Sequence, residues 1–160
     1  MARQVPLTKG KYAIVDDRMY DYISQWKWHY VDSHNGYAAR REYPSGKYIY
    51  MHRQLTDADP TMDVDHINND GLDNRMQNIR VCTTAQNLAN RGILKTNTSG
   101  YRGVIYTGGK WVAQIGGRVN GRRVNTVLGR FDDPKMASAA YEKALIAKYG
   151  SFVKLSRKRG

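Results

Sequence analysis

Four polar side chains in the middle of the chain have the types and the spacing of a hydrolytic site. Asp65 and His66 are adjacent, Asn78 follows His66 by 12 residues, and Asn87 follows Asn78 by 9. Hydrolysis of a phosphodiester needs a base that deprotonates water and positive charge against the developing phosphorane. His66 can be the base because imidazole titrates near neutral pH. Asp65 and an asparagine carbonyl can bind a hard cation, and a second asparagine can hydrogen-bond the imidazole.

Local patterns predict the elements that must position these residues. We expect the end of a strand at 64–67, a loop rich in Asn and Gly at 68–77, a second strand at 78–82 and a short helix at 83–91. Strand, loop, strand and helix would bring the four side chains together. An isolated Asp-His-X-Asn motif is weak evidence, and most asparagines in such loops form turns. We assign that structural role to Asn68, Asn69 and Asn74.

Several motifs here resemble the HNH endonuclease family, in the variant whose third residue is asparagine. "MHRQL", "VDHINNDGLDNR", "NIRVCT" and "QNLANR" are similar to its phage and mobile-intron homing branch over residues 49–91. The resemblance implies that Asp65 and Asn87 are metal ligands, that His66 is the general base and that Asn78 orients the imidazole. It also implies a divalent cofactor, Mg²⁺ with Mn²⁺ as the alternative. Cys82 is the only cysteine, so no structural zinc site is expected.

The positive charge is concentrated in the C-terminal part of the chain. The net charge is +12 over 160 residues, with 11 basic and 11 acidic residues in 1–90 but 15 basic and 3 acidic residues in 91–160. A basic half beside a neutral half is typical of a polyanion-binding module, whereas a basic surface kept for solubility is the alternative. We predict a nuclease domain with a β-rich N-terminal extension at 1–92, a linker at 93–100 and a DNA-binding domain at 101–160.

Alternating apolar residues and glycine-rich turns predict a small sheet in the C-terminal domain. Three antiparallel strands are expected at about 101–106, 111–116 and 123–129, followed by a helix between Asp133 and Gly150. One strand face, Trp111, Ala113 and Ile115, is expected to meet the helix. The helix would present a stripe of mostly small side chains: Met136, Ala137, Ala140, Tyr141, Ala144 and Ala147.

This domain resembles the ethylene-response-factor (APETALA-two) DNA-binding domain of plants. "SGYRGV", "KWVAQI" and "LGRFDDPKMASAAYEKA" carry the resemblance over residues 98–152. It implies that the sheet lies in the DNA major groove. Ile105 and Thr107 stand where plant members have contacting arginines, and Gln114 replaces a glutamate, so the plant target sequence cannot be transferred. The expected DNA-binding residues are Arg102, Lys110, Gln114, Arg118, Arg122, Arg123 and Asn125, with Arg40, Arg41 and Arg53 from the first domain.

The first 50 residues are expected to extend the nuclease domain. They predict a short helix after Asp16-Asp17 and strands broken at 34–36 and 44–46, with the aromatic residues mainly in a core. His52 is expected on a strand beside the site, in a structural role. No apolar run has the length of a signal peptide or a membrane span, so we expect a soluble, cytoplasmic protein.

Together these patterns predict an α+β protein: an N-terminal ββα-metal nuclease domain, then a three-stranded antiparallel sheet packed on one α-helix. The predicted function is metal-dependent hydrolysis of double-stranded DNA near a site that the C-terminal domain binds. One active site per chain favours nicking by a monomer on DNA, with a dimer as the alternative. A DNA-binding transcriptional regulator with an inactive nuclease fold is the second hypothesis. An RNA-binding protein is disfavoured because the sheet lacks a pattern of base-stacking aromatic residues.

Overall fold

The computed structural model of the chain describes residues 1–33, 36–94 and 96–153. The chain divides into two compact units, Met1–Asn87 (unit 1) and Leu88–Gly160 (unit 2). The boundary falls within helix α3 (Thr84–Asn90), because Ala89 near the end of this helix is buried in the core of unit 2. In the described part of the chain, no helix is long and apolar enough to cross a membrane.

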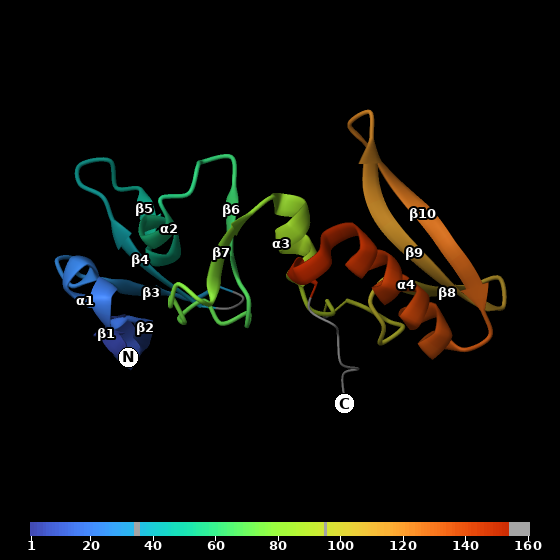
Figure 1. Cartoon of the computed structure of the whole chain (residues 1–160), viewed down its shortest axis with the longest axis horizontal. Helices are drawn as coiled ribbons and strands as arrows, with labels where there is room; N and C mark the ends of the chain where they lie inside the picture. The colour runs from blue at the N-terminus through green and yellow to red at the C-terminus, as the bar shows by residue number, and fades with distance from the viewer. Residues whose placement is uncertain (34–35, 95, 154–160) are drawn as a thin grey trace. The chain divides into compact units, whose positions relative to one another are not determined.

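Unit 1 begins with a hairpin, a helix and a small sheet (Figure 1). The predicted helix after Asp16-Asp17 is present, as are strands on both sides of the predicted breaks, although residues 34–35 lie outside the described residues. Strands β3, β4 and β5 form an antiparallel sheet in that order. The elements are β1 (Ala2–Pro6), η1 (Thr8–Gly10), β2 (Tyr12–Asp16), α1 (Asp17–Ile23), β3 (His29–Val31), β4 (Tyr37–Arg41), β5 (Tyr48–Tyr50) and α2 (Met51–Thr56).

His52 lies on helix α2, so its predicted place on a strand was wrong. The apolar pair Met51 and Leu55 has helical i, i+4 spacing, and burial of both side chains in the core fixes this helix. The run of aromatic residues before it belongs to β5 alone.

The second part of unit 1 has the predicted order of strand, loop, strand and helix. Strand β6 (Asp63–His66) pairs antiparallel with β7 (Ile79–Cys82), and α3 follows. The N-terminal hairpin holds the connecting loop, because Ile14 N–H donates to Leu72 O (2.8 Å) and Asn74 N–H donates to Ile14 O (2.7 Å). A side chain at Gly71 would collide with Gly36 O at 2.0 Å, so this loop also packs closely against the start of β4.

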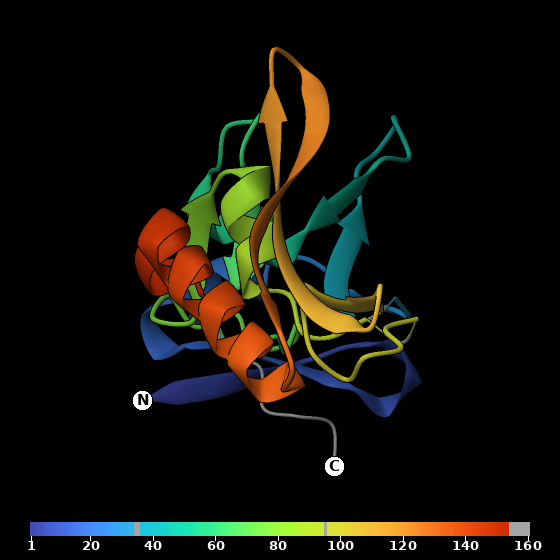
Figure 2. The same ribbon diagram turned by 90° about the vertical axis from the view of Figure 1, so that its right-hand side faces the viewer.

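Unit 2 is a three-stranded antiparallel sheet with one helix. The strands β8 (Val104–Thr107), β9 (Lys110–Val119) and β10 (Arg122–Phe131) lie in the order β10-β9-β8, as predicted. The long helix is α4 (Pro134–Tyr149), followed by η2 (Gly150–Phe152). Figure 1 and Figure 2 show α4 along the sheet and the turn end of the β9–β10 hairpin extending beyond β8.

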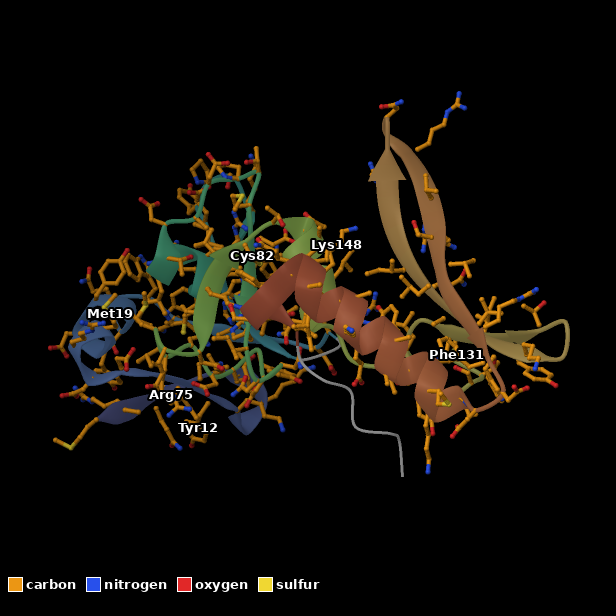
Figure 3. The ribbon with its side chains drawn as sticks, turned by 45° about the vertical axis from the view of Figure 1, so that its right-hand side comes forward. Tyr12, Met19, Arg75, Cys82, Phe131 and Lys148 are labelled. Carbon is orange, nitrogen blue, oxygen red and sulfur yellow. The ribbon has the colours of Figure 1, made fainter. Side chains whose placement is uncertain are left out.

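The core between sheet and helix confirms the predicted strand face. Ala113 is fully buried, and Trp111 and Ile115 pack against the same cluster. On α4 the buried residues are Ala137, Tyr141 and Leu145, whereas Met136 of the predicted stripe is 59% exposed, as is the shorter Ala147. The predicted stripe was therefore rotated. Figure 3 shows Phe131, which also packs against this core, at the end of the sheet beside the start of α4.

A β-bulge in β10 changes which side chains share a face of the sheet. Thr126 pairs with Ile115 and Val127 with Gln114, but the register shifts before Gly129 pairs with Ala113. Because directly paired residues point to the same side, the extra residue carries Arg130 to the side of Gln114. Without the bulge, strict alternation from Val127 would place Arg130 on the side of the helix.

Candidate active site and candidate nucleic-acid interface

Asp65 and Asn87 lie on the same side of the β6–β7 hairpin. Asp63 and Asp65 share one face by the alternation of β6, and Asn87 Nδ2 donates to Asp63 Oδ2 across 3.0 Å. Asp63 is therefore a third oxygen donor beside the two predicted metal ligands. Its spacing of two residues from Asp65 on a predicted strand was the signal that could have identified it.

Asp65 is held by an arginine from the neighbouring strand. Arg80 Nε and Nη2 both donate to Asp65 Oδ2, at 2.9 and 2.8 Å. The Asp65 side chain is 4% exposed and that of Arg80 18%, so the pair is largely removed from water. Cys82, next on the same face, is buried as predicted, and burial raises the pKa of its thiol to about 11. The thiol is therefore neutral and not a nucleophile; Figure 3 labels its place on β7.

His66 turns to the other side of β6, into a cluster of aromatic rings. Its ring centroid lies 4.9 Å from that of His52 in an edge-to-face arrangement and 5.8 Å from that of Tyr37. The side chain is 5% exposed. Burial lowers the pKa of His66, while Asn74 and three nearby aspartates act in the opposite direction. At neutral pH the imidazole is thus uncharged, the form in which it can accept a proton.

The amide that contacts this imidazole belongs to Asn74. Its Nδ2 donates to Leu72 O (3.1 Å) and Gly71 O (3.5 Å), so Oδ1 faces His66 Nε2, at 3.5 Å. An oxygen acceptor requires the proton of the neutral ring to reside on Nε2, which leaves Nδ1 as the basic nitrogen. Sequence reasoning treated Asn74 as a turn former. Its 1% exposure inside a polar loop is what distinguishes it, and the sequence alone does not reveal that burial.

The Asn78 side chain, expected to orient the imidazole, organises the loop. Its Nδ2 donates to Asn68 Oδ1 (3.0 Å) and Asp73 O (2.7 Å), and its Oδ1 accepts from Asn68 N–H (3.1 Å). These bonds use both donors of the amide and its acceptor. Asn78 therefore acts on His66 only through the shape of the loop that also carries Asn74.

His52 presents an unusual buried nitrogen. Its side chain is 8% exposed, and its Nδ1 is the one buried side-chain nitrogen or oxygen without a hydrogen-bond partner in the described residues. Burial, then the charges of His66 and Arg53, lower the pKa of His52 to about 3. The ring stacks on Tyr50 at 5.6 Å and 25°. A neutral imidazole thus forms one wall of the His66 pocket.

The donors on the Asp65 side suit a hard cation. Within the described ranges, no group of three or more His, Cys, Asp or Glu side chains could hold a metal ion. Carboxylate and amide oxygens are nevertheless the ligands that Mg²⁺ prefers, and it binds through one or two carboxylates while keeping several waters. Asp63, Asp65 and Asn87 supply such oxygens, and Arg80 is the positive charge with which a cation would have to share Asp65.

Comparison with known proteins agrees with this part of the chain. Residues 57–89 match the family model of HNH endonucleases. This HNH segment contains Asp65, His66, Asn78 and Asn87 and covers β6, β7 and most of α3. The match supports the HNH resemblance and a nuclease in general, which implies DNA as the substrate. No curated protein and no solved structure matches the chain at a significant level.

The sheet of unit 2 has a face opposite α4, which we call the outer face. Strand pairing arranges its side chains in rows across the sheet. No acidic residue occurs from Val104 to Phe131, whereas five basic residues do. Most of these side chains are exposed, and Val112 is the buried centre. The rows are Thr107–Lys110, Ile105–Val112–Arg130, Gln114–Val127, Gly116–Asn125 and Arg118–Arg123.

The structure gives several predicted DNA-binding arginines other contacts. Arg102 donates to Leu88 O, Ala89 O and Arg91 O at 2.6–2.8 Å, and thereby caps the end of α3. Arg53 donates to the carbonyls of Met62 and Asp59 at 2.8 and 3.0 Å. Three further arginines differ in position: Arg40 lies over the Trp26 ring, Arg41 is exposed on the β4–β5 hairpin over the Tyr48 ring, and Arg122 alternates to the side of β10 opposite Arg123.

Arg130 was missed by the sequence analysis. It is exposed on the outer face because of the bulge before Gly129. The extra length of "RRVNTVLG" relative to the plant domain was the available signal, although it does not specify where a bulge forms.

Proposed function

We propose that the protein is a metal-dependent DNA endonuclease of the homing type. It hydrolyses a phosphodiester bond of double-stranded DNA near a site bound by the outer face of unit 2, and one active site per chain nicks one strand. The observation that carries the proposal is the match of residues 57–89 to HNH endonucleases, because this segment holds the complete Asp65, His66, Asn78 and Asn87 set.

His66 would be the general base. Its Nε2 donates to Asn74, so Nδ1 accepts the proton of the attacking water. The water oxygen bonds to phosphorus as the bond from phosphorus to the 3′ oxygen breaks, which leaves a 5′-phosphate and, after protonation, a 3′-hydroxyl. A lowered pKa keeps His66 neutral before the reaction, and Asn74 keeps the ring in the useful tautomer.

Asp65 and Asn87, with Asp63 beside them, would hold the divalent cation. When bound, the cation supplies positive charge for the phosphoryl oxygens and the leaving 3′ oxygen. Arg80 keeps the Asp65 carboxylate ionised and in place without it. His66 is adjacent to Asp65 in the chain, so the base and the ligand set sit at the same end of β6 although their side chains leave on different faces.

A transcriptional regulator with an inactive nuclease fold is the second candidate. The ion pair that Arg80 makes with Asp65 and the 5% exposure of His66 favour it, because a working site must admit water and a cation. Incubation of the full chain with supercoiled plasmid and Mg²⁺ separates the two functions. The endonuclease converts the plasmid to nicked circles and stops in excess chelator, whereas plasmid that remains supercoiled despite DNA binding supports the regulator.

A further inference from the structure

We propose that the outer face of unit 2 recognises a duplex whose central base pairs are A·T. The inference rests on the proposed DNA binding by this face and concerns the base pairs that the face selects. It follows from the order in which polar, apolar and basic side chains are arranged along β9 and β10.

The basic side chains of the outer face lie at its two ends. Lys110 and Arg130 occupy the first two rows, and Arg118 and Arg123 form the last row beside the hairpin turn. Rows two residues apart on a strand are separated by about 6.6 Å, so the four steps from Lys110 to Arg118 cover roughly 26 Å, or about eight base pairs at 3.4 Å each. Lysine and arginine at both ends can then contact phosphates on either side of a central region.

The middle rows carry side chains that suit adenine and thymine. Ile105 is 43% exposed and Val127 59% exposed, and they flank Gln114 on the same face. Asn125 follows in the next row. Glutamine and asparagine pair through two hydrogen bonds with adenine N6 and N7, whereas apolar side chains contact the thymine C5-methyl group. Arginine, which most often selects guanine, is absent from the Gln114–Val127 and Gly116–Asn125 rows.

These side chains form a patch of base-pair size. The rows from Ile105 to Asn125 are two steps apart, or about 13 Å, which corresponds to about four base pairs. A two-stranded β-ribbon fits the major groove, where the thymine methyl group and adenine N6 and N7 are presented. Exposed apolar side chains in a strongly basic, acid-free surface are thus explained by one partner, a duplex that offers methyl groups between phosphates.

The first experiment selects bound duplexes from a random library with the full chain in chelator, so that binding is measured without cutting. The expected sites contain about four consecutive A·T pairs, and DNA of mixed sequence binds more weakly. Recovery of sites whose centre is G·C overturns the inference but leaves DNA binding intact. Failure to retain any duplex contradicts both this inference and the DNA-binding part of the proposed function.

The second experiment removes single methyl groups from the selected site by replacing thymine with uracil. Each contacted methyl should cost about fourfold in affinity, the equivalent of ~0.8 kcal/mol per buried carbon when tenfold is 1.4 kcal/mol. Val127→Ala should abolish the penalty at one thymine. Val124→Ala is the matched control, because Val124 is also exposed on β10 (39%) but pairs with Gly117 on the side of the helix. An unchanged uracil penalty in Val127→Ala and Ile105→Ala overturns the assignment.

Discussion

Replacement of His52 by phenylalanine should remove a large part of the acid sensitivity of unit 1. The pKa of His52 is lowered to about 3 in the folded protein from an ordinary 6.5, mainly by burial. Between these pH values the unfolded chain binds a proton that the folded chain does not, so this group's contribution to stability is complete above pH 6.5 and falls as the pH drops toward 3. One pKa unit corresponds to about 1.4 kcal/mol, which gives a loss of about 2 kcal/mol between pH 7 and pH 5.

The assay is urea unfolding at both pH values, followed by tryptophan fluorescence in a Trp111→Phe background. The remaining tryptophans, Trp26 and Trp28, both report on unit 1. The parent should lose at least ~2 kcal/mol on acidification, because the pKa of His66 is lowered as well, and His52→Phe should lose about 2 kcal/mol less. His29→Phe, at an exposed position of β3, is the control and should keep the parent's loss. An equal loss in His52→Phe and the parent would refute the burial argument.

Four further substitutions test the site and the interface. Asn74→Ala should slow cleavage roughly 10- to 100-fold, part of the ~10²–10⁴ from general-base catalysis, without changing DNA affinity; an unchanged rate contradicts the tautomer assignment. Asp65→Asn, which keeps a partner for Arg80, should abolish Mg²⁺-dependent cutting while circular dichroism shows an intact fold; retained cutting excludes Asp65 as a ligand. Arg102→Ala should destabilise unit 2 by about 1.5–3 kcal/mol in thermal unfolding, through loss of charged hydrogen bonds to the end of α3; unaltered stability would return Arg102 to the DNA. Arg123→Ala should weaken binding to all duplexes alike and flatten the log–log salt slope by about 0.9, as one lost phosphate contact requires; a loss confined to one sequence would indicate base contact.

The sheet and helix of unit 2 could be predicted because strong local signals mark each boundary. Gly108 and Gly109 both have positive φ values, as do Asn120 and Gly121, so the two turns lie where the sequence places them. Asp133 Oδ1 accepts from Lys135 N–H and begins α4 as a capping residue. The face of Arg130 could not be predicted, because a bulge results from packing across strands and not from local preference.

The candidate active site was predicted as a set of residues but not as a set of contacts. The spacing of Asp65, His66, Asn78 and Asn87 follows from strand, loop and helix, each with its own local pattern. The partners that matter in the structure come from distant segments. His52 arrives from α2, and β2 anchors the loop that brings Asn74 to His66, which no local pattern specifies.

The central claim is most directly tested by the rate at which His66→Ala cuts supercoiled plasmid in Mg²⁺, with DNA affinity measured on the same preparation. The proposed mechanism predicts a rate lower by about 10²–10⁴ and an affinity close to that of the parent, because the substitution removes the base and leaves the basic outer face unchanged. Cleavage by His66→Ala at the parental rate would contradict the assignment of His66 as the base and, with it, the proposed active site.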